Sequence, residues 1–533
     1  MLLQLLLLAV SCQADVGPIV ETSQGKVQGF ITVSRGGRNY RVFAGIPYAK
    51  PPVGELRFKA PEAAEAWTDV RQAKEHGPMC PQVNIYFGGG PVGVEDCLYL
   101  SVFTPEKDGK YPVAVHLHGG GWILGEGPRM KGPQFLMDED IVVVDFNYRI
   151  GVLGFLSFED DVVPGNMGLK DMVMALKWVK QNIAKFGGDP DRVTLLGECA
   201  GADAVYHLMV SPMSKGLFSG GIAESGSSYT TQAVSPPGLA RQRAEEVARL
   251  FGCKGSTSAE MVNCLREKDA LEMAAVLSKF MNFQIDPVLS FSPVLEMHSP
   301  EPALTAPMSI WKTAPVPLLT GITSGEGLLR TMFFTKNFDV SQLESDFNNK
   351  IANTLMLPDF SSDPNKIMAK VRDYYFTGDS VSTVDNFKNL TDMIGDNWFS
   401  FGVLEGAVLH TAPVYMYYFD YIGEHTMSEF FGDKSRATGA FHTDEAMYIW
   451  EVHGMPPHAG KDLDMSRNLI KIWTKFIKDG TPTVPEVTKT EWKPYLPAEN
   501  YMEITKNGFE LKKGLITERY NFWKSLNFRD KLM

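Results

Sequence analysis

The first residue with clear chemical potential is Cys199, at the centre of Gly197-Glu-Cys-Ala-Gly201. Residues 193–196 before it have the apolar pattern of a buried strand, and residues 200–210 after it favour a helix. The spacing G-x-S-x-G marks a sharp strand-to-helix turn on which a nucleophilic side chain is exposed. In this chain a thiol stands where that pattern has a hydroxyl, so attack requires the thiolate.

A glycine run, His118-Gly-Gly-Gly-Trp122, follows a second strand-like segment at residues 113–117. The backbone N–H groups of an unhindered glycine loop can stabilise negative charge that develops on a substrate oxygen. Such a loop acts together with the amide of the residue after the nucleophile. We therefore expect Gly120, Gly121 and Ala200 to form an oxyanion hole.

A nucleophile on this kind of turn is followed along the chain by an acid and then by a histidine. Glu326 lies between two glycines in Thr320-Gly-Ile-Thr-Ser-Gly-Glu-Gly327, after a strand-like segment, and is our candidate acid. Of the later histidines, His442 lies in a loop between a strand pattern and a helix-like segment at residues 444–452. We expect Cys199, Glu326 and His442 to be the catalytic residues.

The other histidines fit structural positions better. His453 and His458 flank a pair of prolines and are predicted to lie in surface turns. His116 alternates within a strand pattern, which predicts a histidine buried in the core.

Composition limits the classes of function. The 533 residues are 44% hydrophobic and 21% charged, as in a folded globular protein, and the net charge of −12 argues against nucleic acid and anionic membranes as partners. The leucine-rich residues 1–14 predict a secretory signal peptide, followed by one domain over residues 15–533 without a membrane anchor. We expect a secreted protein with neither cofactor nor metal, and Asn389 is its candidate glycosylation site.

The cysteine spacing supports an oxidising compartment. Apart from Cys12 in the predicted signal peptide, four cysteines form two local pairs, each of which predicts a disulfide: Cys80 with Cys97 and Cys253 with Cys264. Cys199 is left without a local partner.

Short β-branched runs alternate with helical patterns through most of the chain. This alternation predicts a mostly parallel sheet covered by helices on both faces. Residues of about 230–310 and 335–400 carry fewer strand signals and are predicted to be helical insertions over the carboxyl edge of the sheet, where open α/β sheets bind ligands. Together with the nucleophile turn, these patterns predict an α/β-hydrolase fold.

Four segments resemble the type-B carboxylesterase family, which includes animal carboxylesterases, cholinesterases and inactive neuroligin-like relatives. They are Gly45-Ile-Pro-Tyr-Ala-Lys-Pro-Pro-Val-Gly-Glu-Leu-Arg-Phe58, Glu95-Asp-Cys-Leu-Tyr-Leu-Ser-Val102, Asn147-Tyr-Arg-Ile-Gly-Val-Leu-Gly-Phe155 and Pro164-Gly-Asn-Met-Gly-Leu-Lys-Asp171. The resemblance runs from about residue 20 to residue 524.

The resemblance implies that Cys199 occupies the position of the family's nucleophilic serine, with the acid, base and oxyanion amides as assigned above. It also implies that Ser225 hydrogen-bonds around these residues and that both cysteine pairs match family disulfides. Glu198, beside the nucleophile, departs from the glutamine common in hormone esterases of insects, and its charge is expected to oppose thiolate formation. No tryptophan lies between Cys80 and Cys97, where cholinesterases bind choline, so quaternary ammonium substrates are not expected.

Four interpretations of Cys199 stay open at this point. In the first, the chain hydrolyses carboxylic esters through a Cys-His-Glu triad, and in the second it is an attenuated homologue that binds or sequesters small apolar ligands. In the third, it is an adhesion or signalling ectodomain. In the fourth, the cysteine is a variant or an engineered trap of a serine esterase. Because the C–S bond is longer than C–O, we expect weak turnover of activated small-molecule esters, with slow deacylation. The sequence does not identify protein partners, which are left unknown.

Overall fold

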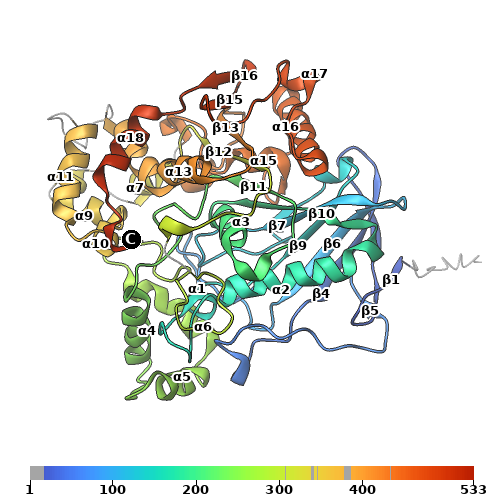
Figure 1. Ribbon diagram of the computed structural model, residues 1–533, viewed down its shortest axis with the longest axis horizontal. Helices are drawn as coiled ribbons and strands as arrows, with labels where there is room; N and C mark the ends of the chain where they lie inside the picture. The colour runs from blue at the N-terminus through green and yellow to red at the C-terminus, as the bar shows by residue number, and fades with distance from the viewer. Residues whose placement is uncertain are drawn as a thin grey trace, which may run out of the picture.

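The computed structural model describes residues 17–305, 308–337, 341–344, 346–376, 386–432 and 434–532. The predicted signal peptide, residues 1–14, lies outside the described residues. Within these ranges the largest sheet has eleven strands, in the order β16-β15-β13-β12-β11-β10-β7-β9-β6-β4-β3 (Figure 1). That residues 15–533 form one domain stays a prediction.

The bounds of the strands follow the chain. The large sheet contains β3 (Phe30–Val33), β4 (Asn39–Pro47), β6 (Tyr99–Pro105), β7 (Tyr111–Leu117), β9 (Val142–Phe146), β10 (Gly188–Glu198), β11 (Gly220–Glu224), β12 (Leu318–Thr323), β13 (Val414–Asp420), β15 (Asn500–Thr505) and β16 (Gly508–Lys513). Two small sheets contain β1 (Ile19–Glu21), β2 (Lys26–Gln28) and β5 (Arg71–Gln72), and β8 (Lys131–Gly132) with β14 (Glu451–Val452).

The predicted mostly parallel sheet is confirmed. The central strands pair in parallel, in the order β9, β7, β10, β11, β12, β13 and β15. The pairs at both edges are antiparallel: β3 with β4, β4 with β6 and β6 with β9 at one edge, and β15 with β16 at the other. Parallel strands need crossover connections, which the helices supply. The family fold expected from the sequence, an α/β hydrolase, is the observed one.

The helices cover the sheet and its carboxyl edge. They are α1 (Gly151–Phe155), α2 (Met167–Asn182), α3 (Ala200–Val210), α4 (Leu239–Leu250), α5 (Ser258–Arg266), α6 (Ala270–Ala275), α7 (Leu328–Asn337), α8 (Ser341–Glu344), α9 (Phe347–Thr354), α10 (Leu357–Phe360), α11 (Pro364–Tyr375), α12 (Phe387–Gly395), α13 (Phe401–Leu409), α14 (Ser428–Phe431), α15 (Asp444–Ile449), α16 (Gly460–Asp479), α17 (Pro485–Thr488) and α18 (Thr517–Leu526). In Figure 1, α4 and α5 lie below α9, α10 and α11, and all five lie to one side of the sheet. They occupy the two predicted insertions. No helix in the described part of the chain is long and apolar enough to cross a membrane.

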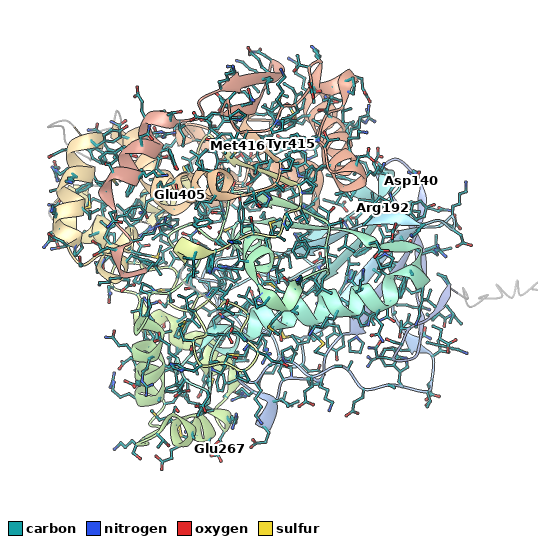
Figure 2. The ribbon with its side chains drawn as sticks, in the orientation of Figure 1. Asp140, Arg192, Glu267, Glu405, Tyr415 and Met416 are labelled. Carbon is teal, nitrogen blue, oxygen red and sulfur yellow. A yellow bond between two sulfur atoms is a disulfide. The ribbon has the colours of Figure 1, made fainter. Side chains whose placement is uncertain are left out.

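The core is divided between the two faces of the sheet. Leu195 packs with residues of α2 and α3, whereas its neighbour Leu196 packs with residues of α16. Figure 2 labels a second such pair on β13: Met416 belongs to the same core cluster as Leu195, and Tyr415 packs against the core cluster that contains Leu196. Successive strand side chains point to opposite faces, so one apolar run such as residues 193–196 supplies both cores.

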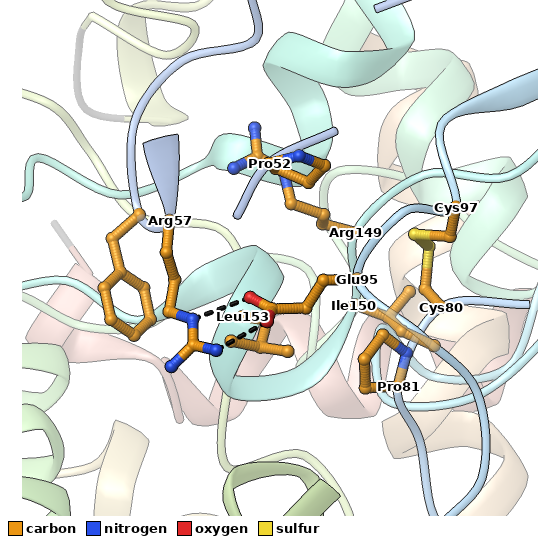
Figure 3. A pocket seen from close by; sticks show the side chains of 10 residues that line it. Pro52, Arg57, Cys80, Pro81, Glu95, Cys97, Arg149, Ile150 and Leu153 are labelled. Atoms are coloured by element: carbon orange, nitrogen blue, oxygen red, sulfur yellow. Dashed lines mark hydrogen bonds and ion pairs between the residues drawn. A yellow bond between two sulfur atoms is a disulfide. The ribbon is translucent and has the colours of Figure 1, made fainter. Parts of the chain in front are cut away.

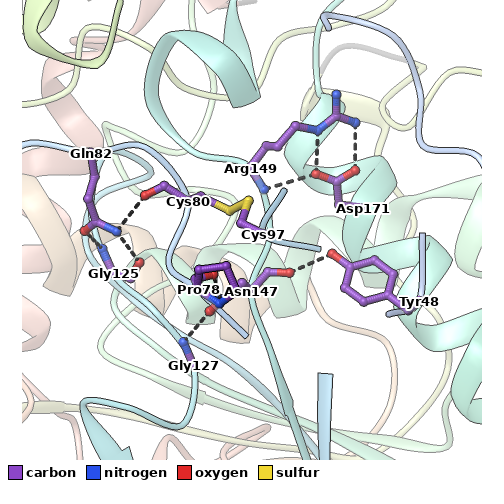
Figure 4. Close-up of a disulfide and its surroundings, with 10 residues drawn as sticks. All are labelled: Tyr48, Pro78, Cys80, Gln82, Cys97, Gly125, Gly127, Asn147, Arg149 and Asp171. Carbon is purple, nitrogen blue, oxygen red and sulfur yellow. Dashed lines mark hydrogen bonds and ion pairs between the residues drawn. A yellow bond between two sulfur atoms is a disulfide. The ribbon is translucent and has the colours of Figure 1, made fainter. Parts of the chain in front are cut away.

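Both local cysteine pairs are disulfide-bonded in the structure, Cys80 to Cys97 and Cys253 to Cys264. Figure 4 shows that the first lies beside a loop tied to the segment after the glycine run. Gln82 donates to the Gly125 carbonyl at 2.9 Å and accepts from its N–H at 2.8 Å. The disulfide loop therefore helps to fix the chain that leaves the glycine loop.

A small cavity beside this disulfide has a structural role. Figure 3 shows Arg57 and Glu95 joined there by two hydrogen bonds, of 2.6 and 2.5 Å. The cavity is about 10 Å³, which is at most the space of one water molecule. It cannot hold a substrate.

Candidate active site

The turn that carries Cys199 has the backbone strain expected of a nucleophile elbow. Cys199 follows β10 and precedes α3 with φ 57° and ψ −125°, and its N–H donates to the Glu224 carbonyl at 2.8 Å. A Cβ on Gly197 would lie 2.4 Å from the Gly201 carbonyl oxygen, and one on Gly201 would lie 1.9 Å from that of Leu117. Only glycine fits at both flanking positions, as the sequence pattern predicts.

The loops that carry Glu326 and His442 are joined by their backbones. Gly325 and Phe441 form an isolated parallel bridge, in which the Gly325 N–H donates to the Ala440 carbonyl at 2.9 Å. Nδ1 of His442 lies 2.5 Å from Oε2 of Glu326, and both residues are 3% exposed. Two segments separated by 116 residues thus bring the expected acid and base together.

Two further donors hold the Glu326 carboxylate. Its Oε1 accepts from the Ser225 hydroxyl at 2.6 Å and from the Thr323 N–H at 2.8 Å. Ser225 therefore occupies the place that the family resemblance implied. Burial and the nearby Glu326 charge raise the pKa of Glu445, which lies 3.4 Å from the Ser225 hydroxyl, to about 7. A carboxylate held by several donors fixes the orientation of the imidazole that it binds.

Cys199 and His442 act on each other electrostatically. Burial alone would raise the pKa of Cys199, but His442 and the Gly120 and Ala200 amides lower it below the usual value of a thiol. Burial alone would lower the pKa of His442, but Cys199 and Glu326 raise it well above the usual value. Both shifts favour a thiolate–imidazolium pair. Nε2 of His442 nevertheless has no aligned hydrogen bond within the described chain, so the two groups are close without ideal geometry.

Aromatic packing against one face of its ring holds the imidazole of His442. The ring of Phe399 stacks on it with centroids 4.1 Å apart and an interplanar angle of 24°. Phe399 belongs to a π-helical turn, η8 (Asp396–Ser400), between α12 and α13. Single π turns often occur at functional sites because they redirect side chains.

The expected oxyanion donors line one cavity with Cys199. Gly120, Gly121 and Ala200 all line this cavity, and the Gly120 and Ala200 amides lower the pKa of Cys199. Gly120 has φ 110°, and a Cβ there would lie 2.0 Å from the Leu124 carbonyl oxygen. The loop conformation therefore requires glycine at this position.

Replacing Gly120 with alanine is expected to lower kcat/KM for aryl esters by about 10²–10³-fold, the usual effect of losing one oxyanion donor. The Cβ would displace the loop, and with it the Gly120 amide. Steady-state kinetics measure the loss. Gly37→Ala is the matched control, because Gly37 also has a positive φ, 81°, but a Cβ there meets nothing within 4 Å. An equal loss in both variants would contradict the role of the loop.

Glu198 belongs to a buried ionic network. The Oε2 of Glu198 lies 2.9 Å from Nε2 of His116, and Nδ1 of His116 lies 3.2 Å from Asp145. The Oε1 of Glu198 contacts Lys131 and accepts from the Gly119 N–H at 3.2 Å. Burial alone would raise the pKa of Glu198, but Lys131 and His116 hold it well below its usual value. Burial alone would lower the pKa of His116, but Asp145 and Glu198 raise it to about 9.

This network changes two expectations from the sequence. His116 is buried as predicted, but it is also an ionic partner and lines the cavity, which nothing in its strand pattern indicated. The negative charge of Glu198 was expected to oppose the thiolate. In the structure two cations neutralise it, so this expectation loses its basis.

The cavity around Cys199 is about 430 Å³ and mostly apolar. That volume is in the range of small-molecule sites. Its apolar lining includes Leu124, Val288, Leu289, Leu329, Trp398 and Phe399. Several of these residues come from the insertions, whose helical pattern was visible in the sequence although the individual contacts were not.

Comparison with known proteins places the chain in a family. A model described as "Carboxylesterase family" matches residues 16–523. Juvenile hormone esterase of Tribolium castaneum is 36% identical over 95% of this chain and 93% of its own length. Esterase FE4 of Myzus persicae is 37% identical over 98% and 96%, and liver carboxylesterase of Sus scrofa is 34% identical over 96% and 93%. The chain therefore belongs to the carboxylesterase family and, with it, to the carboxylic ester hydrolases.

Proposed function

We propose that this protein hydrolyses small carboxylic esters through Cys199, His442 and Glu326, with turnover limited by deacylation. The observation that supports this most strongly is the convergence of a free thiol, an acid-bound imidazole and the Gly120 and Ala200 amides in one cavity. Each group has the chemistry that acyl transfer needs.

In the acylation step, the Cys199 thiolate adds to the ester carbonyl carbon, and the carbonyl electrons move onto oxygen. The amides of Gly120, Gly121 and Ala200 stabilise that oxyanion. When the electrons return, the bond to the alkoxy oxygen breaks and Nε2 of His442 gives its proton to the leaving alcohol. The product is a thioester on Cys199.

In the deacylation step, Nε2 of His442 takes a proton from water as the oxygen adds to the thioester carbonyl. The C–S bond then breaks and releases the acid and the thiolate. Because this bond is longer than C–O, the oxyanion is displaced from amides arranged for a serine adduct. We therefore assign the slow step to deacylation.

The test is intact mass spectrometry after brief incubation with p-nitrophenyl acetate. We expect the mass to rise by one acetyl group, and peptide mapping to place it on Cys199. Cys199→Ala is the matched control and should stay unmodified. Equal release of p-nitrophenol by the wild type and by Cys199→Ala, with no acetyl group on Cys199, would contradict the mechanism.

Retention of apolar ligands is a second candidate function. It is favoured by the missing aligned hydrogen bond at Nε2 of His442, together with the apolar cavity. In that case ligands bind, but acyl transfer is negligible. The same mass experiment separates the two functions, because a binding protein would show neither acylation nor p-nitrophenol release.

We also propose that the protein is secreted and glycosylated at Asn389. The predicted signal peptide at residues 1–14 and the two disulfides support secretion, and one relative is named venom carboxylesterase-6 of Apis mellifera. Asn389 lies half-buried on α12. The relatives' names include a juvenile hormone esterase and a fatty acyl-CoA hydrolase, so they do not select one substrate.

A further inference from the structure

One polar side chain in the cavity has no part in the proposed chemistry. Gln232 is 4% exposed and lines the same cavity as Cys199. Its Oε1 is buried and has no hydrogen-bond partner within the described chain. Most buried polar atoms do have partners, so an orphaned carboxamide at a binding cavity needs an explanation.

The backbone around Gln232 is fixed on both sides. The Thr231 hydroxyl donates to the Asn397 carbonyl at 2.8 Å, and Nε2 of His207 lies 2.8 Å from the Ala233 carbonyl oxygen. Burial lowers the pKa of His207 to about 4, so the ring is neutral and this nitrogen donates. Gln232 is thus held between α3 and the π-helical turn, and backbone movement does not easily turn it toward solvent.

Much of the cavity lining that Gln232 shares is apolar. Val288, Leu289 and Trp398 line the same cavity, and the Trp398 indole N–H is already used, donating to the Thr354 carbonyl at 2.8 Å. Leaving a buried amide unpaired costs free energy that a hydrogen bond from a ligand would recover. A hydrocarbon ligand cannot make that bond.

We infer that Gln232 is a specificity-determining residue that hydrogen-bonds a hydroxyl group carried on the chain of the ester, so that hydroxylated esters are preferred over pure hydrocarbon ones. The orphaned atom is Oε1, which can only accept, so a hydroxyl satisfies it by donating and an ether oxygen does not. This inference rests on the proposed function for its substrate class, but the binding site itself does not depend on turnover.

The kinetic test uses matched ester pairs in which a terminal methyl group is replaced by a hydroxyl. For the acyl side the pair is p-nitrophenyl hydroxyacetate and propanoate; for the alcohol side it is 2-hydroxyethyl and propyl acetate. The ratio of kcat/KM within a pair is compared between the wild type and the near-isosteric Gln232→Met. Intrinsic reactivity cancels in this comparison. We expect the ratio that favours the hydroxylated ester to fall about five- to tenfold in Gln232→Met, for either the acyl pair or the alcohol pair. This is the effect of losing one hydrogen bond.

A binding test makes the inference independent of catalysis. Affinities for 2-hydroxyethyl and propyl acetate, and for methyl hydroxyacetate and methyl propanoate, are measured by calorimetry in Cys199→Ala with and without Gln232→Met. Gln72→Met is the matched control, because it makes the same substitution at an exposed glutamine outside the cavity lining and should leave every ratio unchanged. A preference in binding that Gln232→Met removes, together with no ester turnover by the wild type, would support the inference and refute the proposed function. Ratios that Gln232→Met leaves unchanged in both tests would overturn the inference, whether or not esters are hydrolysed.

Discussion

Replacing His442 with alanine is expected to lower kcat/KM for short aryl esters by about 10³–10⁴-fold. The imidazole is the group placed both to receive the thiol proton and to return a proton to the leaving alcohol, and Glu326 at 2.5 Å and the stacked Phe399 orient it. Without it, only the Gly120 and Ala200 amides oppose the rise in the thiol pKa that burial causes, and the leaving group departs as an alkoxide. Steady-state kinetics with p-nitrophenyl acetate measure the loss.

The same variant should change the pH dependence of thiol alkylation. His442 lowers the pKa of Cys199 in the folded protein, so thiolate is present below the usual thiol pKa and is lost only as the pH falls through the lowered value. In His442→Ala the midpoint of the iodoacetamide profile should move to higher pH. His425→Ala is the control, because His425 pairs with Glu429 away from the cavity. An unchanged midpoint in His442→Ala would show that the two side chains are not coupled.

The sequence was most informative where chemistry and backbone geometry coincide. The elbow around Cys199 could be predicted because Gly197 and Gly201 are sterically required. Glu326 and His442 could be predicted because each lies in a loop after a strand of a parallel sheet, and such loops meet at one edge. What the patterns could not supply was the bridge between Gly325 and Phe441, which sets the distance between acid and base.

The residues that sequence reasoning missed depend on distant contacts. His116 follows the alternation of an ordinary strand residue, and only the fold brings it against Glu198 and Asp145. The π-helical turn that presents Trp398 and Phe399 has no local signal, because the residues around it form regular helices. Gln232 lies in a segment without strong periodicity, so its unpaired carboxamide becomes visible only once its neighbours are placed.

Replacing Cys199 with serine is expected to raise kcat for alkyl and aryl esters by about 10²–10³-fold, as recovery of a well-placed oxyanion would do. The shorter C–O bond returns the tetrahedral oxygen to the amides of Gly120, Gly121 and Ala200. A hydroxyl is not ionised at neutral pH, but His442 is placed to take its proton during attack. The kcat of both proteins is measured under saturating ester. The burst of p-nitrophenol that slow deacylation predicts for the wild type should disappear in the serine variant as deacylation becomes fast.

Two controls make the Cys199→Ser result decisive. Iodoacetamide should inactivate the wild type and leave Cys199→Ser unaffected, since Cys199 is the one free cysteine in the described part of the chain. The double variant Cys199→Ser with His442→Ala should lose the gain, because serine needs the base more than a thiolate does. A serine variant slower than the wild type would mean that the oxyanion amides and His442 are arranged for sulfur. Cys199 would then be the nucleophile for which this site is built, and the slow step would lie elsewhere than in deacylation.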